Sequence, residues 1–149
     1  MDFREHVLTH YQQLVQDRID AFRDMIDALS EDSRNDAKGS AGDKHETALS
    51  MMHIEQEKIN RKLAECLEQK AILDRIRKAG IPTRVALGSL VTANDQVLFV
   101  SAALPKKIIE GRTVIPLSPA APLGQLIIGR SVGEEFEMGA TRFTIRALG

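Results

Sequence analysis

Two acidic residues three positions apart, Asp43 and Glu46, are the residues of this sequence best suited to do chemistry. They lie where one long helical pattern has ended and a second begins. At this spacing the two carboxylates face the same side of a helix start, where they can share a divalent ion whose other ligands are waters, an arrangement that Mg²⁺ tolerates. Asp-x-x-Glu ahead of an apolar run is also a capping-box pattern, in which Asp43 accepts from the Glu46 amide and Glu46 reaches back. Both interpretations stay open.

The same position limits how tightly a metal can bind. A helix amino terminus carries partial positive charge, so we expect two carboxylates there to hold Mg²⁺ weakly unless another protein supplies further ligands. No tightly bound cofactor is expected. His45 and His53 lie nearby, but they lack a third ligand at suitable spacing and form no zinc motif. From Asp24 to Glu46 there are seven acids and three bases, which suggests a tip aimed at cationic surroundings or metal, or a solvated loop.

Residues 1–80 predict two long helices. Apolar residues recur every seven positions in each run, Leu8, Val15, Phe22 and Leu29 in the first and Met52, Ile59, Cys66 and Leu73 in the second. We expect the first helix from about 3 to 30 and the second from about 45 to 79, where Gly80-Ile81-Pro82 ends it. The polar segment 30–42 between them predicts a mobile loop.

Each apolar stripe is narrow and long, so the simplest structure is an antiparallel hairpin in which the two stripes bury one another. Roughly 27 paired residues would make a rod of about 40 Å. A plain two-helix seam or a dimerising coiled coil is the alternative for the same stripes. Cys66 falls at a seam position with no base near it, which favours a small core residue over a nucleophile.

Residues 81–149 predict a small twisted sheet with one short helix, so the fold class is α+β. The helix is expected within 118–129, which opens with a cap and prolines and closes on Gly. Lys106 and Lys107 with Arg112 and Arg130 could form a basic, partner-binding patch or a solvated edge. The expected strands are Ala86–Ala93, Gln96–Ala102, Thr113–Leu117, Glu134–Met138 and Thr141–Leu148.

Composition excludes several classes of protein. The chain has 149 residues and a formal net charge of −1, so it offers nucleic acid no general attraction. One cysteine cannot form an internal disulfide, and no apolar stretch resembles a secretion signal or approaches the roughly 20 residues that span a bilayer. We expect a soluble cytoplasmic protein, monomeric and without membrane contact.

Three segments resemble the bacterial transcript cleavage factors of the Gre type, the GreA/GreB family. The run from Ser118-Pro119 through Leu126-Ile127-Ile128-Gly129-Arg130 to Gly133-Glu134-Glu135 is similar to the segment that precedes the last two strands of that family. Leu87-Gly88-Ser89-x-Val91-Thr92 resembles the first strand of the same domain, and Gly42-Asp43-x-x-Glu46-x-Ala48 resembles the hairpin tip. With these segments on a long helical hairpin joined to a small sheet domain, the resemblance covers nearly the whole chain.

The resemblance implies a coiled-coil hairpin over 1–80 and an antiparallel sheet domain of the FK506-binding-protein type over 81–149. It implies that the sheet domain docks on the rim of the RNA polymerase secondary channel and that the hairpin enters the channel. There Asp43 and Glu46 would help hold a Mg²⁺ shared with polymerase and orient a water, so that polymerase itself hydrolyses backtracked RNA near its 3′ end. The chain would then not be an enzyme.

Departures from the family pattern keep other functions open. Thr47-Ala48-Leu49-Ser50 stands where the family commonly has Asn, Ala, Glu and Tyr. A factor that occupies the channel and modulates or inhibits transcription without cleavage is therefore an alternative. A prolyl isomerase needs an aromatic-lined pocket, for which this domain offers only Phe99, Phe136 and Phe143. A structural coiled-coil adaptor, in which the tip charges are interchangeable, is the remaining alternative.

Overall fold

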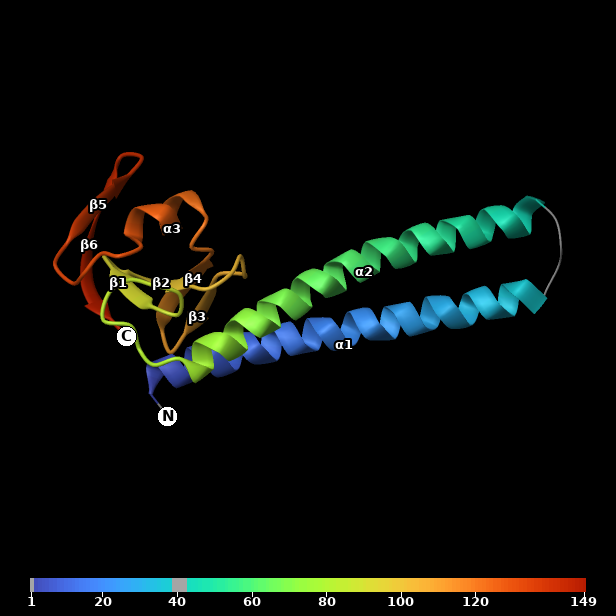
Figure 1. The fold of residues 1–149 in the computed structure, drawn as a ribbon, viewed down its shortest axis with the longest axis horizontal. Coiled ribbons are helices and arrows are strands. Elements are labelled where there is room, and N and C mark those ends of the chain that lie inside the picture. The colour runs from blue at the N-terminus through green and yellow to red at the C-terminus, as the bar shows by residue number, and fades with distance from the viewer. Residues whose placement is uncertain (1, 39–42) are drawn as a thin grey trace. The chain divides into compact units, whose positions relative to one another are not determined.

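Two long helices account for the first half of the computed structural model (Figure 1). The structure describes residues 2–38 and 43–149, and the side chains of these ranges except 33–38 and 43–45. Helix α1 spans Phe3–Lys38 and helix α2 spans Asp43–Lys78. The described residues contain no helix with an apolar stretch long enough for a bilayer crossing.

The predicted loop over residues 30–42 is wrong for residues 30–38, because α1 continues to Lys38, and residues 39–42 lie outside the described residues. Residues 31–38 are polar, but they contain neither Gly nor Pro, and the first Gly of the chain is Gly39. Once a helix exists, each further residue adds a hydrogen bond without a new nucleation cost, so weak helix formers are carried along. At its other end α1 is capped by Asp2, whose Oδ1 accepts from the Glu5 amide at 2.8 Å.

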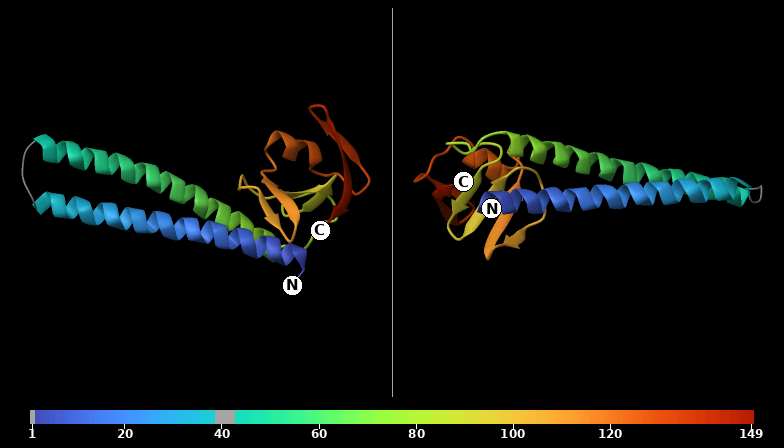
Figure 2. Two further views of the ribbon diagram at one scale, coloured as in Figure 1. Left: turned by 180° about the vertical axis from the view of Figure 1, so that it is seen from behind. Right: turned by 90° about the horizontal axis from the view of Figure 1, so that it is seen from below.

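Contacts divide the chain into two compact units, one of residues 13–70 and one of residues 1–12 with 71–149. In the first unit α1 and α2 run antiparallel and side by side, as two views agree (Figures 1 and 2). The predicted seam is confirmed at four positions where the side chain is buried, Val15, Ile19, Ile59 and Cys66. Further from the sheet end of the helices, Phe22, Ile26, Leu29 and Met52 are only half-buried, because a two-helix hairpin covers each of them from one side.

The second unit contains a six-stranded sheet in the order β3-β4-β2-β1-β6-β5. The α+β class is confirmed, but the sheet is mixed, because β2 and β4 pair parallel. In sequence, the short strand β3 lies between β2 and β4. Sequence patterns did not predict it, and it pairs antiparallel with β4 at the edge of the sheet. The strands are β1 (Leu90–Ala93), β2 (Gln96–Val100), β3 (Lys107–Ile109), β4 (Arg112–Leu117), β5 (Glu135–Met138) and β6 (Thr141–Leu148).

Two local predictions in this unit need correction. The first strand does not begin at Ala86, because Ser89 closes a turn by accepting the Ala86 amide on its Oγ at 2.9 Å. The short helix α3 spans Pro122–Ile127, and its N-cap is Ala121 with no side-chain cap. Ser118, the predicted cap, instead forms the preceding turn, where its Oγ accepts from the Ala120 amide at 3.1 Å.

Apolar side chains cover both faces of the sheet. One face packs against α3 in a buried core of Val85, Val91, Ala93, Leu98, Val100, Leu117, Ile127, Phe136 and Ile145. The other face meets the first turns of α1, where Tyr11 is fully buried and its ring lies 5.8 Å from that of Phe99. Polar bonds fasten the helix ends here, and Gln12 donates to Asp74 at 2.9 Å. The sheet and the ends of both helices therefore form one packed unit.

Tyr11 makes the stability of this unit sensitive to alkaline pH. Burial raises the pKa of Tyr11 to about 12, and its hydroxyl donates to the Pro105 carbonyl at 2.8 Å. In an unfolded chain the phenol loses its proton near pH 10. Between about pH 10 and 12 the folded protein therefore holds more protons than the unfolded chain, so the free energy of unfolding falls as pH rises.

We expect Tyr11→Phe to abolish this contribution to the alkaline slope. At neutral pH the variant should lose about 1 kcal/mol of stability, because the Pro105 carbonyl loses its donor. Urea unfolding of the parent and the variant from pH 7 to 11.5 measures both the loss at neutral pH and the alkaline slope. Deprotonation of the lysines affects both proteins alike, so the difference in slope reports on Tyr11. Equal slopes above pH 10 would show that the Tyr11 proton is not linked to folding.

Candidate functional site

Asp43 and Glu46 occupy the first turn of α2, which begins at Asp43, two residues earlier than expected. The side chain of Glu46 is exposed, and no described residue forms an ion pair with it. The side chain of Asp43 lies outside the described residues. Whether Asp43 caps the helix or binds an ion therefore stays a prediction, while the backbone of both residues is helical with the spacing that puts them on one side.

A hydrogen bond between the two helices fixes the register of the hairpin. Gln56 Nε2 of α2 donates to Ser30 Oγ of α1 at 3.1 Å, so these two residues lie opposite one another. Gln56 interrupts the apolar pattern of its helix, and the bond gives this interruption a role, since a polar pair inside a seam specifies one alignment over its neighbours. Glu46 precedes Gln56 by ten residues of helix, or about 15 Å. The acidic pair therefore lies about three turns of helix away from this bonded pair.

The described side chains around Glu46 do not form a metal site by themselves. Among the described residues, no group of three or more His, Cys, Asp or Glu side chains is placed to hold a metal ion. His53 is exposed, and the side chain of His45 lies outside the described residues. Mg²⁺ takes six oxygen ligands at near-ideal octahedral positions, and two carboxylates supply only part of such a shell. The pair can complete a Mg²⁺ shell whose remaining oxygens come from elsewhere.

Cys66 is confirmed as a buried residue of the seam. Burial raises the pKa of the Cys66 thiol, an effect that Arg18 partly offsets and Glu65 adds to. The thiol therefore keeps its proton at neutral pH and is a poor nucleophile. It borders a hollow of about 420 Å³ between the two helices, lined otherwise by Arg18, Phe22, Lys62, Glu65 and Gln69.

The four predicted partner-binding residues have different surroundings. Lys106 and Lys107 are exposed at the start of β3. The Arg112 guanidinium lies 4.2 Å from the Phe3 ring centre. Arg130 donates to the Leu126 carbonyl and lies 3.8 Å from Glu134, so its charge is partly balanced. Their common role in binding a partner stays a prediction.

The aromatic rings of the sheet unit are used in packing. Phe99 is fully buried against Tyr11, and Phe136 stacks on Phe143 with ring centres 5.1 Å apart. Among the described residues, the cavity that Phe3, Leu90 and Val97 border contains one ring, that of Phe3. A prolyl isomerase would need several aromatic rings facing a substrate cleft, so this use of the rings in packing does not favour that activity.

One positioning residue was missed by the sequence patterns. Arg77 in the last turn of α2 pairs with Glu5 and donates to Gln12 Oε1 at 2.8 Å and to Thr9 Oγ1 at 3.2 Å. It joins the base of α2 to three successive turns of α1. The available signal was a basic residue in the last turn of the second helix, which also fits a solvent-exposed charge at a helix carboxyl end.

Comparisons with known proteins do not settle a family. No protein-family model matches the chain, and no curated protein matches it. Among solved structures the chain is similar to one described as "Structure of the transcription factor Gfh1", with 18% sequence identity over 92% of each chain and a TM-score of 0.35. A likeness with this TM-score carries no weight for fold or function.

Proposed function

We propose that this chain is a transcription elongation factor that binds bacterial RNA polymerase and stimulates cleavage of backtracked RNA by the polymerase. The observation that carries the proposal is the position of the Asp43-x-x-Glu46 pair in the first turn of the second helix of an antiparallel hairpin. The same pair in the Gre-type pattern stands at a hairpin tip. The chain would not be an enzyme by itself.

The chemistry of the pair supports this function. A carboxylate such as Glu46, exposed and without an ion-pair partner among the described residues, is available to a metal ion held by another molecule. In the polymerase active centre the ion would be shared, and it would lower the pKa of a bound water and orient it as the nucleophile. The hairpin contributes position, because its seam and the Ser30–Gln56 bond hold the two helices in one register.

A regulator that enters the channel without stimulating cleavage is the second candidate. The sequence Thr47-Ala48-Leu49-Ser50 favours it, because this second-turn segment of α2 departs from the family pattern directly after Glu46. Thr47 and Ser50 are exposed, so they would meet whatever the tip meets. In this case Asp43 and Glu46 would still approach the polymerase ion but would not leave room for the attacking water.

Photo-crosslinking tests the insertion of the hairpin that both candidates require. A benzoylphenylalanine at Ser50, an exposed position one turn after Glu46, should crosslink to the segments of polymerase that carry its catalytic acids. The matched probe at Glu57, exposed two turns further along α2, should crosslink to the channel wall instead. The proposal is wrong if neither probe crosslinks to polymerase, and a structural adaptor would then be the better account.

A further inference from the structure

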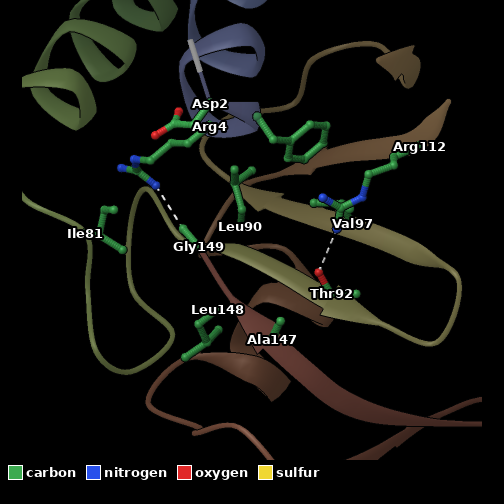
Figure 3. Close-up of a pocket in the computed structure, with 11 residues that line it drawn as sticks. Asp2, Arg4, Ile81, Leu90, Thr92, Val97, Arg112, Ala147, Leu148 and Gly149 are labelled. Carbon is green, nitrogen blue, oxygen red and sulfur yellow. Dashed lines mark hydrogen bonds between the residues drawn. The ribbon is translucent and has the colours of Figure 1, made fainter. Parts of the chain in front are cut away.

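The sheet unit contains a cavity that the proposed function does not use. It has a volume of about 270 Å³ and lies between the first turn of α1, residue Ile81 after α2, and strands β1, β2, β4 and β6 (Figure 3). Its floor and walls are largely apolar. The apolar lining comprises Phe3, Ile81, Leu90, Val97, Ala147 and Leu148, and the polar side chains at its margin are Asp2, Arg4, Thr92 and Arg112.

Arg4 is part of the scaffold of this cavity. Its Nη1 donates to the Gly88 carbonyl at 2.7 Å and to the Gly149 carbonyl at 3.0 Å, which ties α1 to residues far along the chain. Burial lowers the pKa of Arg4, and Asp2 acts in the opposite direction. Two backbone oxygens, those of Gly88 and Gly149, therefore occupy donors of the Arg4 guanidinium.

Arg112 is the charged group of the cavity that remains available to a ligand. Its guanidinium lies over the Phe3 ring at 4.2 Å and its Nη2 donates to Thr92 Oγ1 at 3.1 Å. No described carboxylate lies within ion-pair distance of it, and the residue is exposed. A guanidinium has five N–H donors, and the Thr92 bond uses one of them. Phe3 and Thr92 therefore hold Arg112 in place at the cavity margin without neutralising it.

We propose that this cavity binds a small monocarboxylate with an apolar body, whose carboxylate pairs with Arg112 and whose body rests on Leu90 and Val97. In the view of Figure 3, Leu90 lies between Arg4 and Arg112. An Arg fork matches the two oxygens of a carboxylate, and the apolar floor rewards burial of a hydrocarbon or aromatic group. The inference does not depend on polymerase binding.

Charge and volume restrict the ligand further. Among the described side chains at the margin, Arg112 is the one guanidinium whose donors are largely unused, so the cavity suits a ligand with one carboxylate better than a ligand with two. Pockets for drug-sized ligands are about 300–1,000 Å³, so this one suits a smaller molecule. A phenyl or short alkyl group attached to one carboxylate meets both restrictions.

Phenylacetate is a suitable probe, with phenylacetamide as its neutral isostere and inorganic phosphate as a compact anion. In a titration of the full chain followed by NMR, phenylacetate should produce saturable shifts at the Arg112 Nε–H and the methyl groups of Leu90 and Val97. Phenylacetamide should bind about tenfold more weakly or not at all, because the charge-assisted bonds are lost. Equal shifts from phosphate, or phenylacetate shifts confined to other residues, would overturn the proposal.

Substitution at Arg112 separates this site from a general attraction for anions. Arg112→Gln should weaken phenylacetate binding about tenfold, and Arg112→Lys should restore little, because lysine lacks the planar fork. The matched control is Arg142→Gln, since Arg142 is exposed and pairs with Glu135 and Glu137 on the β5–β6 hairpin. If Arg142→Gln weakens binding as much as Arg112→Gln, the proposed site is wrong.

Discussion

Asp43→Asn with Glu46→Gln should leave binding to RNA polymerase nearly intact and reduce the release of short RNAs from backtracked complexes about 100-fold or more. Amides keep the size and much of the helix propensity of the two side chains but remove the negative charge that a divalent ion needs. A metal ion contributes several kcal/mol to a transition state of this kind, and each 1.36 kcal/mol changes the rate tenfold. The measurement is the rate of transcript shortening at saturating factor.

A control pair on the same helix separates this effect from the general charge of the hairpin. Glu55→Gln with Glu57→Gln removes the same two charges from exposed positions about three turns from the pair. We expect this control to cleave at the rate of the parent protein. If the tip variant also cleaves at that rate, Asp43 and Glu46 are not the effectors, and if both variants are equally slow, only net charge matters.

Shortening the hairpin by one heptad in each helix should also abolish cleavage while polymerase binding persists. Ser30 lies opposite Gln56, so residues 20–26 of α1 lie opposite residues 60–66 of α2, and deleting both segments preserves the pairing at the seam. The deletion moves the acidic pair about 10 Å towards the base of the hairpin. A misplacement of 1 Å can cost about 100-fold in rate, so a shift of this size should leave no measurable stimulation.

The inverse change controls for damage to the fold. Inserting a heptad at the same place in each helix should likewise remove stimulation, because the tip would then extend too far. A seven-residue insertion keeps the phase of the apolar seam and rotates the tip by only about 20°. Circular dichroism should show helix content that follows the residue count in both variants. Undiminished cleavage by either variant would mean that hairpin length does not position the acids.

The long-range architecture of the hairpin was predictable because its signal repeats. Apolar residues at four successive positions of a seven-residue period in each helix leave few alternatives to a paired seam, and Val15, Ile59 and Cys66 are buried there as expected. The extension of α1 to Lys38 was not predictable from composition, because polar residues fit a loop and an exposed helix equally well. The helix that is already formed before Ser30 decides in favour of an exposed helix, because extending it costs no new nucleation.

The sheet shows where local patterns are insufficient. Strand β3 has three residues, two of them exposed, and it follows Pro105, so its sequence shows no alternation. Without β3 the parallel pairing of β2 with β4 cannot be deduced. The bonds of Arg4 join positions 84 and 145 residues apart in sequence, and no spacing rule reaches so far. Such contacts depend on tertiary packing that only the folded chain displays.

The candidate acidic pair was found from its residue types and its place between two helical patterns. The structure supports the place, since α2 begins at Asp43 and Glu46 is exposed. It does not supply the chemistry, because the ligands that would complete a Mg²⁺ shell are expected on another molecule. For the same reason we expect the isolated protein to bind Mg²⁺ with a dissociation constant of about 1 mM or weaker, because two carboxylates at a helix start hold a cation only weakly.

Transcript length in purified, backtracked elongation complexes tests the central claim most directly. The complexes carry RNA labelled at its 5′ end, and the parent protein is added with Mg²⁺ and without nucleotides. The account predicts that the labelled RNA shortens by a few nucleotides and can then be extended again when nucleotides are added. Labelled RNA of unchanged length, at concentrations where crosslinking shows the hairpin inside the channel, would contradict it.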